Sequence, residues 1–121
     1  MGRDEVWRAG EDLAASYLTG LGWRILDRNW RCPSGELDII AVEPGPPEVV
    51  VFCEVKSRRG LGFGPPLEAI TAAKQRKLRD LAVLWLRSQP RPVPRFRIDG
   101  LGVLLPAGGP RRITHVRGIG Q

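Results

Sequence analysis

Two apolar segments, residues 36–42 and 49–57, are interrupted by charged side chains, and this pattern constrains the fold more than any other feature of the chain. Between them lies Pro44-Gly45-Pro46-Pro47, which cannot continue a strand or a helix and therefore predicts a turn. The two segments are then expected to form an antiparallel hairpin. Burying a charge is costly unless the charge is paired or bound to a metal, so these charged residues need an explanation beyond packing.

The positions of the charges in the hairpin depend on its register. If the turn centres on Pro46, Asp38 lies opposite Glu54. The same register places Glu36 opposite Lys56, and all four side chains share one face of the sheet. Directly opposed residues have Cβ atoms about 5 Å apart, and two carboxylates at that distance repel unless a positive charge lies between them. Carboxylate oxygens favour Mg²⁺ or Mn²⁺ over Zn²⁺.

The same spacing also fits an arrangement without a metal. Lys56 would then form an ion pair with Glu54 or Glu36, and Asp38 would accept hydrogen bonds from turn amides. A register shift of one residue would place the two carboxylates on opposite faces of the sheet. The metal-site hypothesis therefore depends on the register.

The remaining sequence predicts helices and further strands around the hairpin. Apolar residues at three- and four-residue spacing indicate helices, and alternating residues indicate strands. The predicted elements are a helix at 4–19, strands at 23–30, 36–42 and 49–57, a helix at 67–87, and strands at 95–105 and 111–116. This α-β-β-β-α-β-β order indicates an α/β fold with a mixed sheet flanked by helices. We expect one domain over residues 1–121.

Charge and composition restrict the partners and the compartment. The net charge is +6 and the pI about 10.3, which favours nucleic acid as a partner, although a basic surface kept for solubility fits as well. The chain has no apolar run of membrane-spanning length and does not open with a secretory signal. Cys32 and Cys53 lie in no metal-binding spacing. We therefore expect a cytoplasmic protein with free thiols and no membrane partner.

Several short motifs together resemble the YraN-like family of small bacterial proteins. The motifs are Gly35-Glu36-Leu37-Asp38-Ile39-Ile40, Phe52-Cys53-Glu54-Val55-Lys56-Ser57-Arg58, Gly10-Glu11, Arg28-Asn29-Trp30, Phe63-Gly64 and the helix that carries Lys74. That family has been grouped with PD-(D/E)xK nucleases, and particularly with archaeal Holliday-junction resolvases. The resemblance therefore implies a restriction-endonuclease-like fold. One position departs from the superfamily pattern: Leu37 stands where the pattern has proline, which is not a metal ligand.

The resemblance also implies roles for the charged residues. Asp38 and Glu54 are expected to ligate Mg²⁺ or Mn²⁺, and Lys56 is expected to orient the attacking water. Glu11 is expected to complete or tune the site from the first helix, where it lies at the edge of the apolar stripe; a solvated helix carboxylate is the alternative. Glu36 is expected to hold Lys56 in place, with a surface carboxylate as the alternative.

Three basic residues are candidates for binding nucleic acid. Arg58 and Arg59 precede a glycine-rich stretch whose backbone can approach a strand, although a mobile surface loop fits as well. Lys74 either contacts phosphate or extends along the apolar seam toward solvent. His115 shows no partner in the sequence and is assigned a structural role. The four tryptophans are expected to pack in the core or at its edge.

The expected function is a metal-dependent endonuclease that hydrolyses phosphodiesters of DNA, branched DNA included. A homodimer is expected only by analogy with resolvases, whose four-way substrate has two-fold symmetry. The alternative is a nucleic-acid-binding protein that keeps the nuclease fold but turns over no substrate on its own.

Overall fold

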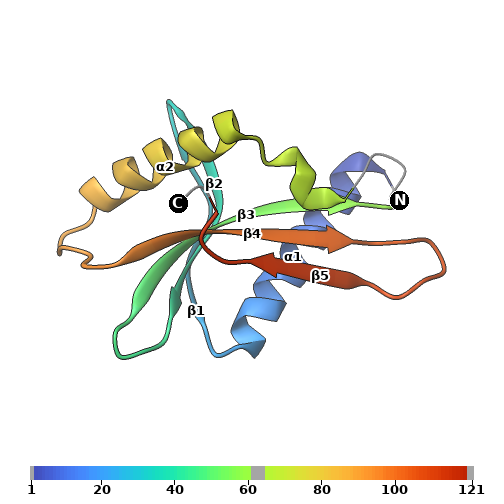
Figure 1. Cartoon of the computed structure of the whole chain (residues 1–121), viewed down its shortest axis with the longest axis horizontal. Helices are drawn as coiled ribbons and strands as arrows, with labels where there is room; N and C mark the ends of the chain where they lie inside the picture. Colours follow the sequence, from blue (N-terminus) through green and yellow to red (C-terminus); the bar gives the residue numbers. More distant parts are fainter. Residues whose placement is uncertain (1, 61–64, 120–121) are drawn as a thin grey trace.

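The protein folds into a five-stranded mixed sheet with a helix on each face (Figure 1). The structure is a computed structural model that describes residues 2–60 and 65–119. The elements are α1 (Arg3–Gly20), β1 (Arg24–Cys32), β2 (Gly35–Glu43), β3 (Val49–Arg58), the 3₁₀ helix η1 (Pro66–Ala69), α2 (Ala72–Arg87), β4 (Phe96–Leu104) and β5 (Arg112–Val116). The strand order is β1-β2-β3-β4-β5; β3 and β4 run parallel, and the other neighbours antiparallel. The predicted α/β class and mixed sheet are confirmed, and the arrangement is consistent with a restriction-endonuclease-like fold.

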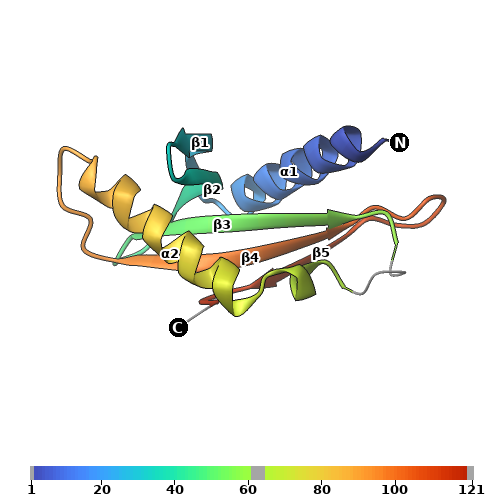
Figure 2. The same ribbon diagram turned by 90° about the horizontal axis from the view of Figure 1, so that it is seen from above.

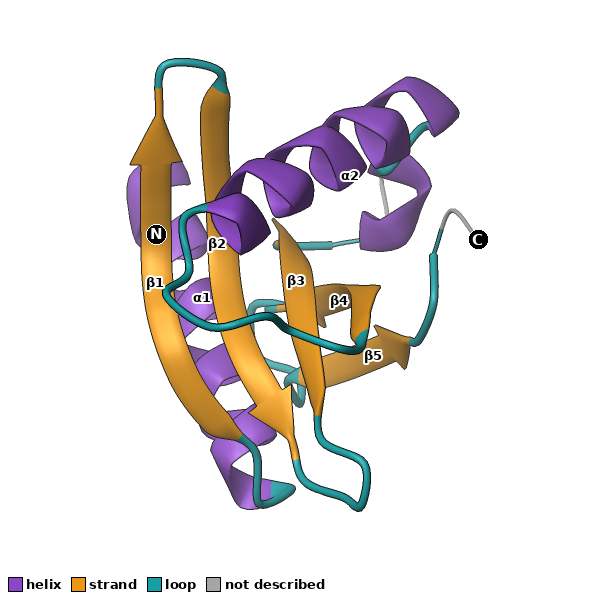
Figure 3. Ribbon diagram, turned by 90° about the vertical axis from the view of Figure 1, so that its left-hand side faces the viewer, coloured by secondary structure: helices purple, strands orange, loops and turns teal. Residues whose placement is uncertain are grey.

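The two faces of the sheet have separate cores, because α1 and α2 cover opposite sides (Figures 2 and 3). Val51 and Cys53 of β3 pack toward α1, whereas Phe52 packs toward α2. The central strand is therefore apolar on both faces, as its unbroken apolar run predicted. Neither helix in the described ranges is both long enough and apolar enough to cross a membrane.

The register of the β2–β3 hairpin is the one that the turn at Pro46 predicted. Ile39 pairs with Cys53, and the pairing continues toward the turn. One further step in the other direction places Asp38 opposite Glu54. There the main-chain N–H of Val55 donates to Asp38 Oδ2 at 2.8 Å. The Asp38 carboxylate thus accepts a hydrogen bond from the β3 main chain just beyond the last residue pair of the β2–β3 ladder.

The prediction of one continuous helix from residue 67 to 87 is wrong in its first turn. The chain forms η1 first, and α2 begins after Thr71, whose Oγ1 accepts a hydrogen bond from the N–H of Lys74 at 3.2 Å. This cap fixes the start of α2. Meanwhile η1 packs closely on β4, where a Cβ added at Gly102 would lie 3.0 Å from Leu67 Cγ. The break allows Leu67 to fill the space that glycine leaves.

The first strand, β1, is irregular in its pairing and in its backbone conformation. The pairing of β1 with β2 shifts between Ile25 and Asp27. Further along, Asn29 has a φ of 55°, a left-handed conformation that asparagine tolerates better than most residues. Its Nδ2 donates to Glu11 Oε1 at 2.8 Å. The irregular strand therefore directs a polar side chain toward α1.

Candidate functional site

The predicted site residues gather in a cleft of about 700 Å³ between α1, the end of β3 and the start of α2. The cleft is lined by every residue predicted for the site except Glu11. Asp38 and Glu54 are buried, at 7% and 6% exposure, whereas Lys56 and Lys74 are half-buried. The cleft thus has an acidic interior surrounded by more exposed cations.

Glu54 is close enough to Asp38 to alter the ionisation of the Asp38 carboxyl. Burial raises the pKa of Asp38 to about 8, and both a hydrogen bond with Glu54 and the charge of Glu54 add to this effect. The hydrogen bond from the Val55 N–H acts in the opposite direction but is outweighed. Asp38 therefore holds a proton near neutral pH, because burial and the neighbouring carboxylate both disfavour its charged form.

Glu54 has an ion-pair partner on α2. Lys74 Nζ lies 3.2 Å from Glu54 Oε2, yet this buried oxygen has no partner in hydrogen-bond geometry. Glu54 Oε2 is therefore ion-paired with Lys74 but makes no hydrogen bond. Lys74 reaches this point because the Thr71 cap places it in the first turn of α2. The metal-free alternative predicted an ion pair between Glu54 and Lys56, but the lysine that pairs with Glu54 is Lys74.

Glu11 is buried rather than solvated, since only 1% of its surface is exposed. Its Oε1 accepts hydrogen bonds from Arg28 and Asn29, whereas its Oε2 is buried without a hydrogen-bond partner. Its charge also contributes to the raised pKa of Asp38. The alternative of a solvated helix carboxylate is therefore wrong. Glu11 does not line the cleft, but its charge acts on Asp38.

A close approach of α1 to β3 positions these groups. Gly10 faces Ser57, and a Cβ added at Gly10 would overlap the Ser57 hydroxyl. Glycine at this position lets α1 lie directly on the strand that carries Glu54. The next residue in α1, Glu11, is thereby buried beside the sheet. The Gly10-Glu11 motif thus combines a packing requirement with a buried charge.

The remaining predicted residues line the cleft but have different contacts from those expected. Glu36 is exposed and pairs with Arg31 at 3.1 Å across the β1–β2 turn, so its expected role in holding Lys56 is not the contact that forms. Arg58 Nη1 donates to the main-chain carbonyl of Ser57 at 3.0 Å. Arg59 is exposed at the end of the strand. The Phe63-Gly64 motif lies outside the described residues.

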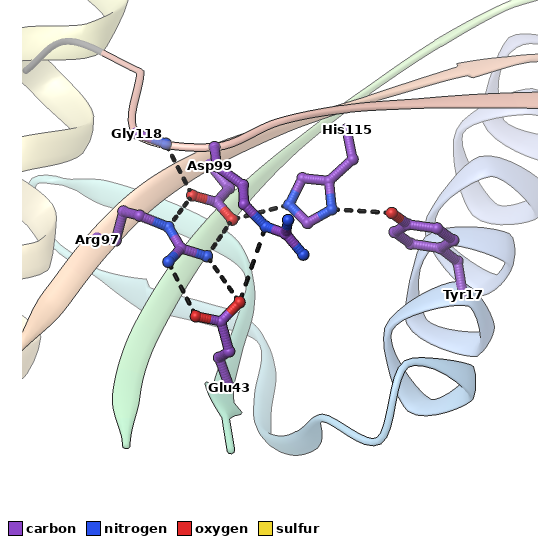
Figure 4. Close-up of polar contacts among 7 residues, drawn as sticks. Tyr17, Glu43, Arg97, Asp99, His115 and Gly118 are labelled. Carbon is purple, nitrogen blue, oxygen red and sulfur yellow. Dashed lines mark hydrogen bonds and ion pairs between the residues drawn. The ribbon is translucent and has the colours of Figure 1, made fainter. Parts of the chain in front are cut away.

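A second buried charge cluster was missed by the sequence reasoning (Figure 4). Asp99 of β4, fully buried, accepts hydrogen bonds from Arg97, His115 and the Gly118 N–H. Burial alone would raise the pKa of Asp99, but these partners outweigh it and lower the pKa. Tyr17 O–H lies 2.9 Å from His115 Nδ1, so His115 does have partners and ties α1 to β5.

The sequence did contain a signal for this cluster. Arg97 and Asp99 are two residues apart in an apolar strand and therefore share a face. This is the same kind of interruption that drew attention to Asp38. Arg97 also pairs with Glu43 of β2 at 3.0 Å, a contact across the sheet that no local pattern reveals.

The chemistry of the acid pair fits a divalent cation with oxygen ligands. Asp38 and Glu54 supply carboxylate oxygens, one of which has no hydrogen-bond partner, and a cation would favour the charged form of Asp38, whose pKa is raised. In the described ranges, no group of three or more His, Cys, Asp or Glu side chains could hold a metal ion. Two carboxylates are nevertheless sufficient for Mg²⁺, which typically completes its shell with water and substrate phosphates.

Comparison with known proteins identifies relatives over nearly the whole chain. The profile of the uncharacterised protein family UPF0102 matches residues 10–103. A UPF0102 protein of Renibacterium salmoninarum is 50% identical over 116 residues, covering 96% of each chain. A UPF0102 protein of Rhodococcus opacus is 52% identical over 108 residues, covering 89% of each chain, and one of Mycobacterium ulcerans is 46% identical over 118 residues, covering 98% of this chain and 96% of its own.

Proposed function

Starting from the premise that this chain belongs to the uncharacterised protein family UPF0102, we propose that it is a metal-dependent endonuclease that hydrolyses phosphodiesters of DNA. The observation that supports this most directly is the buried, undercompensated pair of Asp38 and Glu54 in a cleft with a basic rim. Two carboxylates followed by a lysine two residues after the second also fit the PD-(D/E)xK nuclease superfamily, to which we assign the chain as part of this proposal.

In this proposal Asp38 and Glu54 hold Mg²⁺ or Mn²⁺. The bound cation supplies Lewis-acid polarisation of the phosphate and a water of lowered pKa. The Val55 N–H fixes the orientation of the Asp38 carboxylate through its 2.8 Å hydrogen bond. Lys56, half-buried at the edge of the cleft, orients the attacking water and offsets the negative charge that develops on the phosphate.

Glu11 and Lys74 adjust the charge of the site. Glu11 adds a buried negative charge near Asp38, which strengthens the attraction for a cation. Lys74 compensates Glu54 in the absence of a metal and is positioned to contact phosphate once a cation takes over that role. Arg58 and Arg59 line the same cleft and extend its positive rim along the path of a nucleic-acid backbone.

The similarity to archaeal Holliday-junction resolvases extends the proposal to branched DNA and to a homodimer. A four-way junction has two-fold symmetry, so two copies of the chain would place two equivalent sites on it. The cytoplasm, where DNA is accessible, is the proposed compartment. These extensions depend on the family resemblance rather than on the geometry of the cleft.

A second candidate function is nucleic-acid binding without turnover. The ion pair between Lys74 and Glu54 favours it, because a built-in cation already compensates part of the acid pair. The two candidates differ in whether Mg²⁺ or Mn²⁺ replaces Lys74 as the cation that compensates Glu54. Metal binding and cleavage therefore distinguish them.

Metal binding is tested by thermal unfolding of the protein in chelator and in rising concentrations of Mn²⁺ or Mg²⁺. A ligand of the folded state at about a hundred times its Kd adds about 2.7 kcal/mol to the free energy of unfolding and raises Tm. Asp38→Asn and Glu54→Gln should abolish this rise, whereas Glu43→Gln, a control distant from the cleft, should retain it. An equal rise in all four proteins would place the ion elsewhere.

Cleavage is tested on linear duplex, single-stranded and four-way-junction DNA. Asp38→Asn, Glu54→Gln and Lys56→Met should each lower the cleavage rate by about 100-fold or more, because each removes charge from the transition-state environment. Glu36→Gln is the matched control, since this exposed carboxylate lines the same cleft but pairs with Arg31. Unchanged cleavage by the three variants would assign the activity to another site or to a contaminating nuclease.

A further inference from the structure

One of the four tryptophans differs from the others in its surroundings. Trp23 and Trp85 are buried, at 5% and 6% exposure, and each lies edge-to-face against another aromatic ring. Trp30 is partly buried and packs against the core on the α2 side. Trp7 of α1 is 38% exposed and lines the cleft that contains the acid pair. Trp7 is therefore the one tryptophan with an exposed ring surface at the cleft.

Trp7 shares the cleft with several cations as well as with the acid pair. Arg3, one helical turn earlier and four residues away, shares its face of α1 and also lines the cleft. Across the cleft, Lys56 and Arg58 come from β3. An exposed indole that shares its cleft with cations fits a ligand that combines a flat aromatic ring with negative charge. A nucleotide has both, because its base stacks on an aromatic face and its phosphate pairs with Arg or Lys.

The position of Trp7 at the cleft indicates which form of nucleic acid fits. A base inside a duplex is stacked between its neighbours, so its flat face is not available to a protein side chain. A base in a single strand, flap or junction is available. A volume of about 700 Å³ is of the size of ligand-binding clefts, which span roughly 300–1,000 Å³. The cleft can therefore hold a nucleotide-sized group beside the acid pair.

We propose that Trp7 is a stacking platform for an unpaired base, so that the cleft selects nucleic acid with an unpaired nucleotide next to the phosphate at Asp38 and Glu54. Arg3 binds the backbone of that same strand. This inference rests on the proposed function for the identity of the reactive phosphate, but base stacking itself needs neither metal nor turnover. It assigns substrate selection to α1 and phosphate chemistry to β2 and β3.

The test measures binding of a short fluorescently labelled single-stranded oligodeoxynucleotide and of a duplex of equal length, both in chelator so that no cleavage occurs. Stacking contributes about 1–3 kcal/mol per base, so Trp7→Ala should weaken single-strand binding by about ten-fold or more and leave duplex binding nearly unchanged. Trp7→Phe keeps an aromatic face and should retain most of the affinity. Trp7→Leu keeps an apolar side chain without the ring and should behave like Trp7→Ala.

Two controls separate stacking from general effects. Leu84→Ala removes a comparably exposed apolar side chain from α2, outside this cleft, and should leave binding unchanged. Quenching of tryptophan fluorescence by the unlabelled single strand should be strong in the wild-type protein and largely lost in Trp7→Phe, even though that variant still binds. Thermal unfolding of each variant verifies that it is folded.

The outcomes distinguish this inference from the proposed function. Full single-strand affinity in Trp7→Ala, or equal losses for single strand and duplex, would overturn the role of Trp7. If Trp7→Ala does not fold, Trp7→Phe and Trp7→Leu are compared instead. Equal single-strand affinity of these two variants would also overturn the role of Trp7. Binding that depends on Trp7 without cleavage by the wild-type protein would support the stacking platform and contradict the endonuclease proposal.

Discussion

Two buried carboxylate clusters on neighbouring strands of this sheet have opposite electrostatic character. Asp99 on β4 receives hydrogen bonds from Arg97, His115 and a main-chain N–H, and its pKa is lowered. Asp38 of β2 faces another carboxylate and one main-chain N–H, and its pKa is raised to about 8. The number of compensating donors, rather than burial, decides the sign of the shift.

This difference separates a structural cluster from a candidate functional one. Around Asp99 the donors come from β4, β5 and the segment after β5, so the cluster fastens the C-terminal part of the chain to the sheet. Around Asp38 and Glu54 a buried oxygen has no hydrogen-bond partner and the cleft opens to solvent. A site poised to bind a cation must leave such groups incompletely compensated, at a cost in stability.

The largest effect should follow from breaking the satisfied cluster. Asp99→Asn leaves the half-buried Arg97 guanidinium with less compensating charge, and we expect the free energy of unfolding to fall by about 3 kcal/mol. Chemical denaturation at neutral pH measures this loss, with the exposed Asp80→Asn as the control. A loss no larger than that of the control would mean that Asp99 does not stabilise the fold.

The pH dependence of the same variant checks the sign of the shift. The pKa of Asp99 in the folded state lies below its ordinary value of 3.8. Its contribution to stability is therefore present above that value and is lost as the pH falls through the folded-state pKa. The difference in stability between the wild-type protein and Asp99→Asn should shrink in strong acid. A difference that stays constant would argue against a lowered pKa.

A smaller effect of the opposite sign is expected at the acid pair. The folded-state pKa of Asp38 is raised to about 8, so its favourable contribution is full below 3.8 and is lost as the pH rises toward 8. In chelator, Asp38→Asn should therefore become more stable than the wild-type protein as the pH rises from 5 to 8, by about 1 kcal/mol. Asparagine can still accept the Val55 N–H and can donate to Glu54.

Thermal unfolding across this pH range makes the comparison, with the exposed Asp80→Asn as the control. If Asp38→Asn is less stable than the wild-type protein at every pH, the carboxylate is fully compensated in the folded state. The two clusters would then not differ in the way described. The sign of the change, rather than its size, decides the question.

The smallest effect is expected at Lys74, whose ion pair with Glu54 is half-exposed. Lys74→Met should lower stability in chelator by less than about 1 kcal/mol, because solvent screens such a pair. In Mn²⁺ the variant should regain the stability of the wild-type protein, since the cation compensates Glu54 instead. Lys77→Met, exposed on the same helix, is the control. A loss that Mn²⁺ does not restore would separate Lys74 from the metal site.

Local sequence patterns predicted most of the fold. Alternating and helical periodicities located the elements, and the proline-rich turn fixed the register that brings Asp38 opposite Glu54. The start of α2 was missed because the Thr71 cap competes with an apolar seam that continues through Leu67. Periodicity shows which residues face the core. It does not show where a side chain such as Thr71 accepts a hydrogen bond from the first turn and so starts a new helix.

The sequence by itself determined most of the elements, the hairpin register and the presence of two acids with a nearby lysine, because these depend on residues close together in the chain. Only the tertiary structure decided which cation pairs with Glu54, that Glu11 is buried, that Trp7 lines the cleft and that Asp99 is fully compensated. Those facts depend on contacts between elements far apart in the chain. Solvation and compensation of a charge are properties of that assembled environment, and no local spacing encodes them.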